Sequence, residues 1–210
     1  MLVFSRTITP KPGHEDELAA AVAMMPQHAE TLGLPTVAYR SVGSGVPGRI
    51  RFAGVAPGLA ELVAAQGRQP PEVTAAVDAL RREHNVTAQD QILRLVTMSP
   101  AAAPAPAPLL YGVIARIDRT HVHAAIANNA AFSERCVALG ASYGFALFPL
   151  TGPSAELHLV LGFDTPARFD EWVGLLVGDE QAQAILRQGT GFTSWAHNDD
   201  YIGELWARLG

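Results

Sequence analysis

The residues best suited to chemistry lie together near the end of the chain, at positions 195–201. They read Trp-Ala-His-Asn-Asp-Asp-Tyr and so combine an aromatic ring, an imidazole, an amide, two carboxylates and a phenol. The unperturbed pKa of a histidine is close to neutral pH, so His197 is suited to accept a proton from a phenol. We predict His197, Asn198 and Trp195 as catalytic residues and Tyr201 as a substrate contact.

This stretch is expected to belong to an irregular loop, spanning 189–201, that precedes a last strand at 202–209. Loops at the end of a sheet commonly carry functional groups. Once a phenol has lost its proton, the electron-rich phenolate can react directly with dioxygen, which is the chemistry of an oxygenase without a cofactor. The alternative interpretation is a solvated connection in which Asp199 and Asp200 face water and Trp195 covers the core.

Five residues on predicted strands are further candidates for contacting a substrate. Arg6 and Arg116 occupy matching positions in two apolar strands and can grip an anionic oxygen, or else reach water or a carboxylate at a strand end. Tyr143 and Phe145 share one face of a strand and are predicted to wall an aromatic pocket. His158 alternates with leucines, so it is predicted either to line a cavity or to be a satisfied core histidine.

Several other kinds of site are not indicated. The sequence has no hydrolase triad, zinc-binding signature or Walker sequence. His121 and His123 have a spacing that does not place two metal ligands on one face of a helix, and we predict no metal site. The stretch 43–48 matches the dinucleotide fingerprint, but predicted strands lie on both sides of it, whereas a phosphate-binding loop must lead into a helix. We interpret it as a strand connection.

Composition limits the protein to a few broad classes. The chain has 210 residues, of which 49% are hydrophobic, so it can bury a substantial core. The formal charge of −5 comes with no basic cluster, which argues against nucleic acid as a partner. The lone Cys136 excludes an internal disulfide framework. No signal peptide or membrane-spanning run is apparent, so we predict a cytoplasmic protein without a membrane partner.

The chain is predicted to consist of two similar halves. The stretch 99–108 is rich in proline and alanine, which favours an extended spacer over a core element. It divides a first half, 1–98, from a second half, 109–210. Several features recur in the same order and at nearly constant separation, which suggests duplication: Arg6 and Arg116, Leu32-Gly33 and Leu139-Gly140, Pro57 and Pro166, and His84-Asn85 and His197-Asn198.

Each half is predicted to fold in the order strand, helix, strand, strand, helix, strand, which is the ferredoxin-like βαββαβ order. The strands of the first half are expected at 2–9, 36–42, 49–55 and 90–98, with helices at 15–32, 60–65 and 72–84. Those of the second half are expected at 109–116, 142–149, 156–163 and 202–209, with helices at 120–139, from 165 onward and at 179–188. The helix from 165 is expected to bury Phe169, Trp172, Val173 and Leu176, with Trp172 as a core residue.

Two sheets of this kind pack face to face in the dimeric α/β-barrel superfamily, which the chain resembles. The opening strand 3–6 with its Pro-Gly turn at 12–13, and the strand-to-helix passage 159–164, are similar to the antibiotic-biosynthesis monooxygenases of that superfamily. The resemblance implies an α+β fold in which two tandem ferredoxin-like halves pack sheet to sheet as an intramolecular dimeric α/β-barrel.

The resemblance also implies a function. Antibiotic-biosynthesis monooxygenases act on polycyclic phenolic compounds, some without a bound cofactor, so we expect an oxygenase acting on an aromatic or polyketide-like molecule in secondary metabolism. An oxygenase that uses reduced flavin or haem, or a polyketide cyclase, is the alternative within this fold. A further alternative is a barrel protein without catalytic activity that binds a small molecule or acts in a stress response. The partners implied are a small aromatic molecule and a second copy of the chain in a homodimer.

Overall fold

The computed structural model describes residues 1–16, 33–42, 48–68, 87–100, 105–152 and 155–209, with six further positions between 71 and 82. Within these ranges, the side chains at 66, 193–201 and 206–209 are not described. The predicted helix at 15–32 and most of the one at 72–84 therefore lie outside the described residues. No helix in the described part of the chain is long and apolar enough to span a membrane.

The chain forms two compact units. Unit 1 comprises residues 1–93 and 204–210, and unit 2 comprises residues 94–203. Two strands, β4 (Thr87–Ser99) and β8 (Thr193–Leu209), contribute residues to both units. The fourth strand of each predicted half is thus longer than its sequence pattern indicates.

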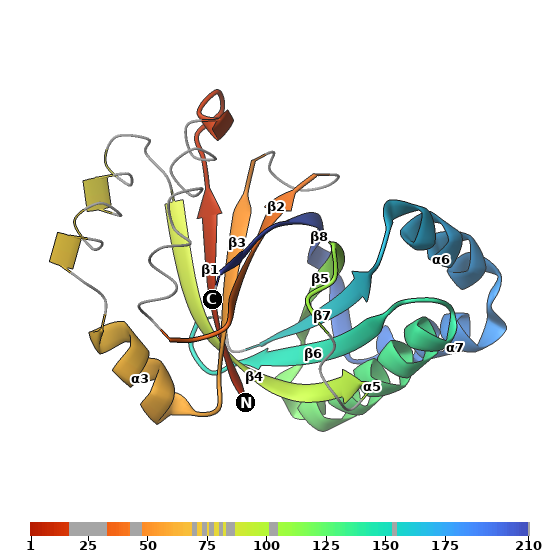
Figure 1. The fold of residues 1–210 in the computed structure, drawn as a ribbon. Helices are drawn as coiled ribbons and strands as arrows, with labels where there is room; N and C mark the ends of the chain where they lie inside the picture. Colours follow the sequence, from red (N-terminus) through yellow and green to blue (C-terminus); the bar gives the residue numbers. More distant parts are fainter. Residues whose placement is uncertain are drawn as a thin grey trace. The chain divides into compact units, whose positions relative to one another are not determined.

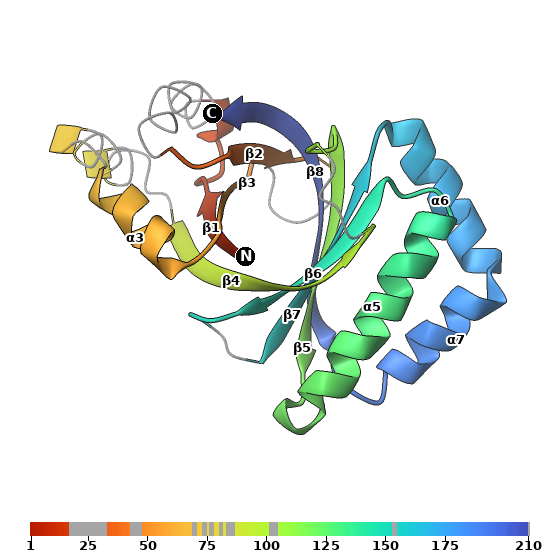
Figure 2. The same ribbon diagram turned by 60° about the horizontal axis from the view of Figure 1, so that its bottom comes forward.

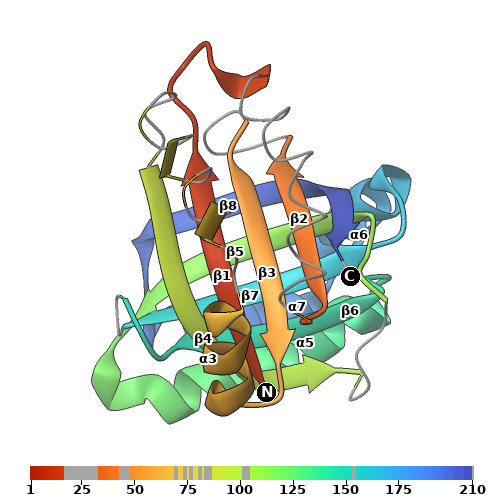
Figure 3. The same ribbon diagram turned by 60° about the vertical axis from the view of Figure 1, so that its left-hand side comes forward.

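Unit 1 contains β1 (Leu2–Thr9), β2 (Thr36–Ser41) and β3 (Ile50–Ala56), followed by α3 (Leu59–Gly67). The hydrogen-bonded order is β4-β1-β3-β2, with β8 next to β2. The first four of these strands lie side by side in Figure 3. Buried and half-buried residues alternate along β3, as expected for a strand with one covered face. The order of the four strands is that of a ferredoxin-like unit.

Most of the Gly-rich stretch, 43–47, lies outside the described residues, but strands come before and after it in the chain, as predicted. β2 and β3 pair antiparallel, with Ala38 opposite Phe52. No helix follows the connection, because residue 50 already belongs to β3. The match to a dinucleotide fingerprint therefore lacks the helix N-terminus that such a site requires.

Unit 2 contains β5 (Leu109–Ile117), β6 (Tyr143–Pro149) and β7 (Glu156–Phe163). The hydrogen-bonded order is β8-β5-β7-β6, with β4 next to β6, which again is the ferredoxin-like order. The helices α5 (Val122–Ala138), α6 (Pro166–Gly178) and α7 (Glu180–Gly189) cover one face of this sheet (Figures 1 and 2). The predicted α+β class with tandem ferredoxin-like halves is confirmed.

Local sequence signals explain where the helices of unit 2 begin and end. A short 3-10 helix, Arg119–His121, precedes α5, and Asp118 caps it by accepting a hydrogen bond from the Thr120 amide. Thr165 caps α6 in the same way, with Pro166 in the first turn, as predicted. Gly140 adopts a φ of 119° just after α5, a conformation that side chains rarely adopt.

Two predictions about unit 2 are wrong. The loop expected at 189–201 is a strand from Thr193 onward, because pairing of β8 with β5 overrides the weak strand preference of its Asn and Asp residues. Val173 is 39% exposed rather than buried. α6 buries only a narrow stripe centred on Trp172, and Val173, the next residue in the helix, lies outside that stripe and faces water.

The sheet of unit 2 has two distinct faces. Leu157 and Leu159 of β7 point toward the helices, as do Tyr111 and Val113 of β5, which pair with Leu161 and Leu159. The intervening residues of each strand point to the other side. The helix-facing side carries the larger hydrophobic core, which comprises Leu109, Phe132, Cys136, Ala141, Leu159, Leu161, Phe163, Trp172 and Ala182.

Candidate functional site

A cavity of about 250 Å³ lies inside unit 2, between the sheet and its helices. The sheet contributes residues of β5 and β7, and the helices contribute residues of α5, α6 and α7. Most of the lining is aliphatic or aromatic. The described residues that line it are Tyr111, Val113, Ala115, Ala125, Asn128, Asn129, Phe132, Leu157, Leu159, Trp172, Leu176, Leu186, Gly189 and Phe192.

Four side chains of this mostly apolar lining carry a polar atom, those of Tyr111, Asn128, Asn129 and Trp172. The Oδ1 atoms of Asn128 and Asn129 and the Nε1 atom of Trp172 are buried and have no hydrogen-bond partner within the described structure. A buried polar group without a partner costs about 1–3 kcal/mol. The three residues that carry these atoms all line this cavity, whose wall therefore combines apolar surface with a few polar groups, as in small-molecule sites.

The Trp172 ring is held in place by other aromatic rings. Its centroid lies 5.8 Å from Tyr111, 5.3 Å from Phe163 and 5.8 Å from Phe169, in tilted arrangements. Such pairs add to the stabilisation from buried area. The indole is therefore fixed before any ligand arrives, which lowers the entropic cost of using its N–H group.

Cys136 lies behind this ring and has no access to solvent. Burial raises the pKa of its thiol to about 12, opposed by a smaller effect of the nearby Trp172 indole. The indole does not meet the geometry of a hydrogen bond to the sulfur, so Nε1 keeps no partner. Cys136 is a core residue rather than a nucleophile, because a thiol in this state is not ionised at neutral pH.

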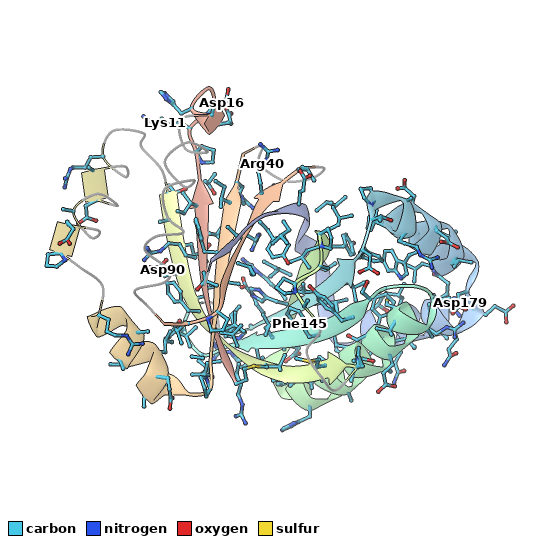
Figure 4. All side chains as sticks on the ribbon, viewed as in Figure 1. Lys11, Asp16, Arg40, Asp90, Phe145 and Asp179 are labelled. Carbon is cyan, nitrogen blue, oxygen red and sulfur yellow. The ribbon has the colours of Figure 1, made fainter. Side chains whose placement is uncertain are left out.

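An ion pair ties the helices around the cavity to one another. The Arg135 guanidinium of α5 donates two hydrogen bonds to the Asp179 carboxylate, one of them from Nε to Oδ1 at 2.9 Å. Figure 4 shows Asp179 among the helices of this unit. Asp179 also accepts from the Ala182 amide and so caps α7. These hydrogen bonds, that of Arg135 first, lower the pKa of Asp179 to about 2.

The predicted contact residue Arg6 is paired within unit 1. Its Nε and one terminal nitrogen donate to the two oxygens of Asp90 at 2.7 Å each, and its guanidinium lies 5.6 Å from the Phe4 ring. A bidentate pair of this kind satisfies the planar guanidinium well. This corresponds to the alternative in which Arg6 reaches a carboxylate at a strand end.

The other predicted strand contacts share the second face of the unit 2 sheet, opposite the cavity. Tyr143 and Phe145 stack with centroids 5.8 Å apart, so they do share a strand face, and Figure 4 shows Phe145 at the strands. His158 points the same way, is 5% exposed, and has its Nε2 3.5 Å from Glu156 Oε2. Arg116 is on this face as well and is exposed. None of these four is among the described residues that line the cavity.

The Tyr143 ring lies directly over Gly162, its cross-strand partner. The tyrosine hydroxyl accepts a hydrogen bond of 3.2 Å from the buried Ala107 amide. The side chain therefore fastens the segment before β5 to the sheet. This role is structural and stands apart from the predicted one in substrate binding.

The predicted catalytic residues His197, Asn198 and Trp195, together with Tyr201, lie on β8. Their side chains are outside the described part of the structure. β8 is the neighbour of β5 and follows directly on Phe192, which lines the cavity. Their roles stay predictions.

Metal ligation finds no support among the described residues, which contain no group of three histidine, cysteine, aspartate or glutamate side chains placed to hold an ion. The Nδ1 of His121 lies 3.7 Å from Asp118 Oδ2 and 3.1 Å from the Thr120 hydroxyl. Hydrogen bonds from the Thr120 amide and hydroxyl lower the pKa of Asp118. This group serves as a cap at the entry to α5.

Sequence reasoning missed the two asparagines of the cavity. Asn128 and Asn129 are adjacent in the middle of a helix, where asparagine is a poor helix former. An adjacent pair in an otherwise alanine-rich segment was the available signal. Trp172 was predicted as core, and it does belong to the core cluster, but it also lines the cavity.

The chain is similar to proteins of known structure in its fold, although not in its sequence. No family model matches it, and no curated protein matches it in sequence. An anthrone oxidase-like protein superposes over 100% of this chain and 93% of its own, with a TM-score of 0.76 and 11% identity. Two proteins provisionally assigned as monooxygenases, from Fusobacterium nucleatum and Lactobacillus acidophilus, superpose with TM-scores of 0.71 and 0.64 at 5% and 9% identity, each over 100% of this chain and 94% of its own.

These likenesses, with the strand order above, decide the fold. The chain has the dimeric α/β-barrel fold. Two of these neighbours, described as monooxygenases, share this fold. Because one fold hosts many activities, the function of this dimeric α/β-barrel protein has to be argued from the cavity itself.

Proposed function

We propose that the protein is a small-molecule oxygenase that binds a neutral aromatic compound in the unit 2 cavity. The observation that carries this proposal is that three residues with buried, unpartnered polar atoms, Asn128, Asn129 and Trp172, belong to one mostly apolar lining. An apolar cavity with a few convergent polar groups is the usual form of a small-molecule site. The aromatic rings around it suit a flat ligand.

The three polar side chains have complementary roles in this proposal. The Trp172 indole can only donate a hydrogen bond, so its partner must be an acceptor such as a carbonyl or phenolate oxygen. Each asparagine amide can donate or accept, depending on its rotation by 180°. Donors fixed in a dry cavity stabilise a developing negative charge on the ligand oxygen more strongly than water does. Together they would hold the oxygen edge of the ligand.

His197 is the proposed base that removes the phenolic proton, with Asn198, Trp195 and Tyr201 as proposed neighbours of the ligand. Two observations support this: β8 pairs with β5, and it continues directly from the cavity residue Phe192. Among the described lining residues, the Tyr111 phenol is the one titratable side chain, and it is a poor base at neutral pH. His197 on β8 would supply the proton acceptor that the described lining lacks.

The proposed reaction needs no external reductant. A ring-flanked methylene loses one proton to the base to give a phenolate-like anion, which reacts with dioxygen at carbon. One oxygen atom becomes the new carbonyl oxygen, the other leaves as water with the two hydrogens of the methylene, and the substrate supplies all four electrons. The residues Asn128 and Trp172 would stabilise the anion before oxygen adds.

Haem and flavin fit this cavity poorly. The cavity of about 250 Å³ is smaller than the range of about 300–1,000 Å³ that is typical of larger ligand sites. The anionic groups of haem and flavin nucleotides are usually met by arginine, lysine or a helix N-terminus, and the described lining has no charged side chain. We therefore derive no step through either group.

A second candidate function is the binding of a small aromatic molecule without catalysis. The scarcity of titratable side chains in the described lining favours it. A polyketide cyclase would use the same cavity but would consume no oxygen.

For each of these functions we propose that the protein is cytoplasmic, where its single cysteine stays reduced, and that it has a role in secondary metabolism.

The test is oxygen uptake by the purified protein with anthrone as the substrate. We expect wild type to consume one dioxygen per anthrone, and the variants Asn128→Leu, Trp172→Phe and His197→Ala to be slower by at least tenfold. Arg168→Ala is the control, because Arg168 is exposed and pairs with Glu171 on the outer side of α6.

The outcomes separate the candidates. Saturable binding of anthrone without oxygen uptake would replace the oxygenase with the binding protein. Conversion of a linear polyketide without oxygen uptake would indicate the cyclase. Equal rates in wild type and in all three variants would refute the proposed site.

A further inference from the structure

The lining residues of the cavity extend along β5, and this extent bears on ligand size. Tyr111, Val113 and Ala115 line it from one strand, and four residues at about 3.3 Å each span about 13 Å. On α5 the lining residues run from Ala125 to Phe132, about 10 Å at 1.5 Å per residue. The lining therefore extends about 10–13 Å along each of these two elements.

The two ends of this slot differ in character. At one end Phe132 and Trp172 belong to the larger core cluster, against which Tyr111 and Leu176 pack. At the other end Ala125 and Leu157 belong to a separate core cluster, and Ala115 pairs with Leu157 across the strands. One end is therefore walled mainly by aromatic rings, whereas at the other end the small Ala115 and Ala125 side chains lie beside Leu157 and Phe192.

The polar groups lie between these ends. Asn128 and Asn129 are one turn of α5 beyond Ala125 and one turn before Phe132. A ligand whose oxygen reaches the asparagines can therefore extend toward either end. The size of the side chains near Ala125 determines how much space the ligand has on that side of the asparagines.

We propose that Ala115 and Ala125 determine how many fused rings the cavity accepts. Both are buried, with 6% and 3% of their surface exposed, and both face the cavity. A larger side chain at either position would fill the end of the slot without touching the polar groups. This inference rests on the proposed function, because it assumes that the ligand is an aromatic compound.

The slot fits a linear molecule of three fused rings with a polar oxygen on one edge. Each additional ring buries further apolar surface, at about 25 cal/mol per Å², so affinity should rise with ring number until the slot is full. Beyond that point, the overpacking of a closed end opposes binding. The ring number at which affinity stops rising is the property that the alanines set.

The experiment measures dissociation constants for phenol, 2-naphthol and 2-anthrol by fluorescence titration. In wild type we expect 2-anthrol to bind at least tenfold more tightly than 2-naphthol. In Ala125→Leu, and independently in Ala115→Val, we expect the affinity for 2-anthrol to fall at least tenfold while that for 2-naphthol changes less than twofold. Ala127→Leu is the matched control, because Ala127 is on the same helix and exposed.

The design separates the two proposals. If wild type binds none of the three compounds, both the proposed function and this inference are overturned. If wild type binds them but both cavity variants weaken all three equally, or none, the inference alone is overturned. Valine suits a strand position well, so the second variant keeps the test open if the leucine variant does not fold.

Discussion

The substitution Gly162→Ala tests the packing of the unit 2 sheet most sharply. Gly162 is opposite Tyr143 in the β6–β7 pair, and a Cβ at this position would lie 2.3 Å from Cζ of the Tyr143 ring. The glycine does not have a positive φ, so the effect is one of space alone. The ring cannot move freely, because its hydroxyl is bonded to the Ala107 amide and it stacks on Phe145.

The expected cost follows from these contacts. Overpacking a well-filled core costs about 1–3 kcal/mol. For a domain of this size, 1 kcal/mol corresponds to a shift of about 2–4 °C in melting temperature. We therefore expect Gly162→Ala to lower the melting temperature by about 2–12 °C, measured by circular dichroism at constant heating rate.

Gly174→Ala provides the matched control for the same chemical change. A Cβ on Gly174 meets nothing within 4 Å, and the residue is in the exposed part of α6. Alanine is favoured over glycine in helices by about 1 kcal/mol, so this variant should melt about 2–4 °C higher than wild type. The reasoning would be refuted if Gly162→Ala were as stable as wild type, or if adding Tyr143→Leu failed to recover part of the loss.

Three further predictions concern the helices and the cavity. Asp179→Ala should destabilise the protein at pH 7. Because the pKa of Asp179 in the folded protein is lowered to about 2, its ionised carboxylate stabilises the fold above pH 3.8, and this stabilisation is lost as the pH falls from 3.8 to 2. Urea melts should therefore show a smaller difference in stability between variant and wild type at pH 2.5 than at pH 7, and an equal difference at both would contradict this. Cys136 should resist a maleimide at pH 8 in the native protein and react fully in urea, since it is buried and its pKa is about 12; rapid native labelling, read by mass spectrometry, would speak against the buried placement. Asn129→Leu should weaken 2-anthrol binding about 3- to 30-fold, as expected for one lost hydrogen bond, while Arg168→Ala leaves it unchanged.

The fold could be predicted from the sequence because its signals are local. Strands such as β3 alternate in burial, and α6 begins with the expected Thr165-Pro166 pair. The length of β8 could not be predicted, because the polar run at 197–200 disfavours a strand and only pairing with β5 makes it one. Local preference and tertiary pairing conflict at that point.

The candidate site was harder to predict, because it depends on how helices are rotated on the sheet. Asn128 and Asn129 line the cavity only because α5 turns them toward β5 and β7, and no pattern in the helix indicates that face. Likewise, the carboxylate that pairs with Arg6 belongs to Asp90, 84 residues away in the sequence. Such contacts are set by the packing of distant elements, which composition and spacing do not specify.

The most direct test of the central claim is to follow the indole N–H resonance of Trp172 by NMR during a titration with 2-anthrol. The protein is labelled with ¹⁵N-tryptophan, and Trp172→Phe assigns the resonance among the three tryptophans of the chain. We predict a saturable downfield shift, because the unpartnered N–H gains an acceptor. If 2-anthrol binds and this resonance does not move, the ligand is not in the cavity and the account of the site is wrong.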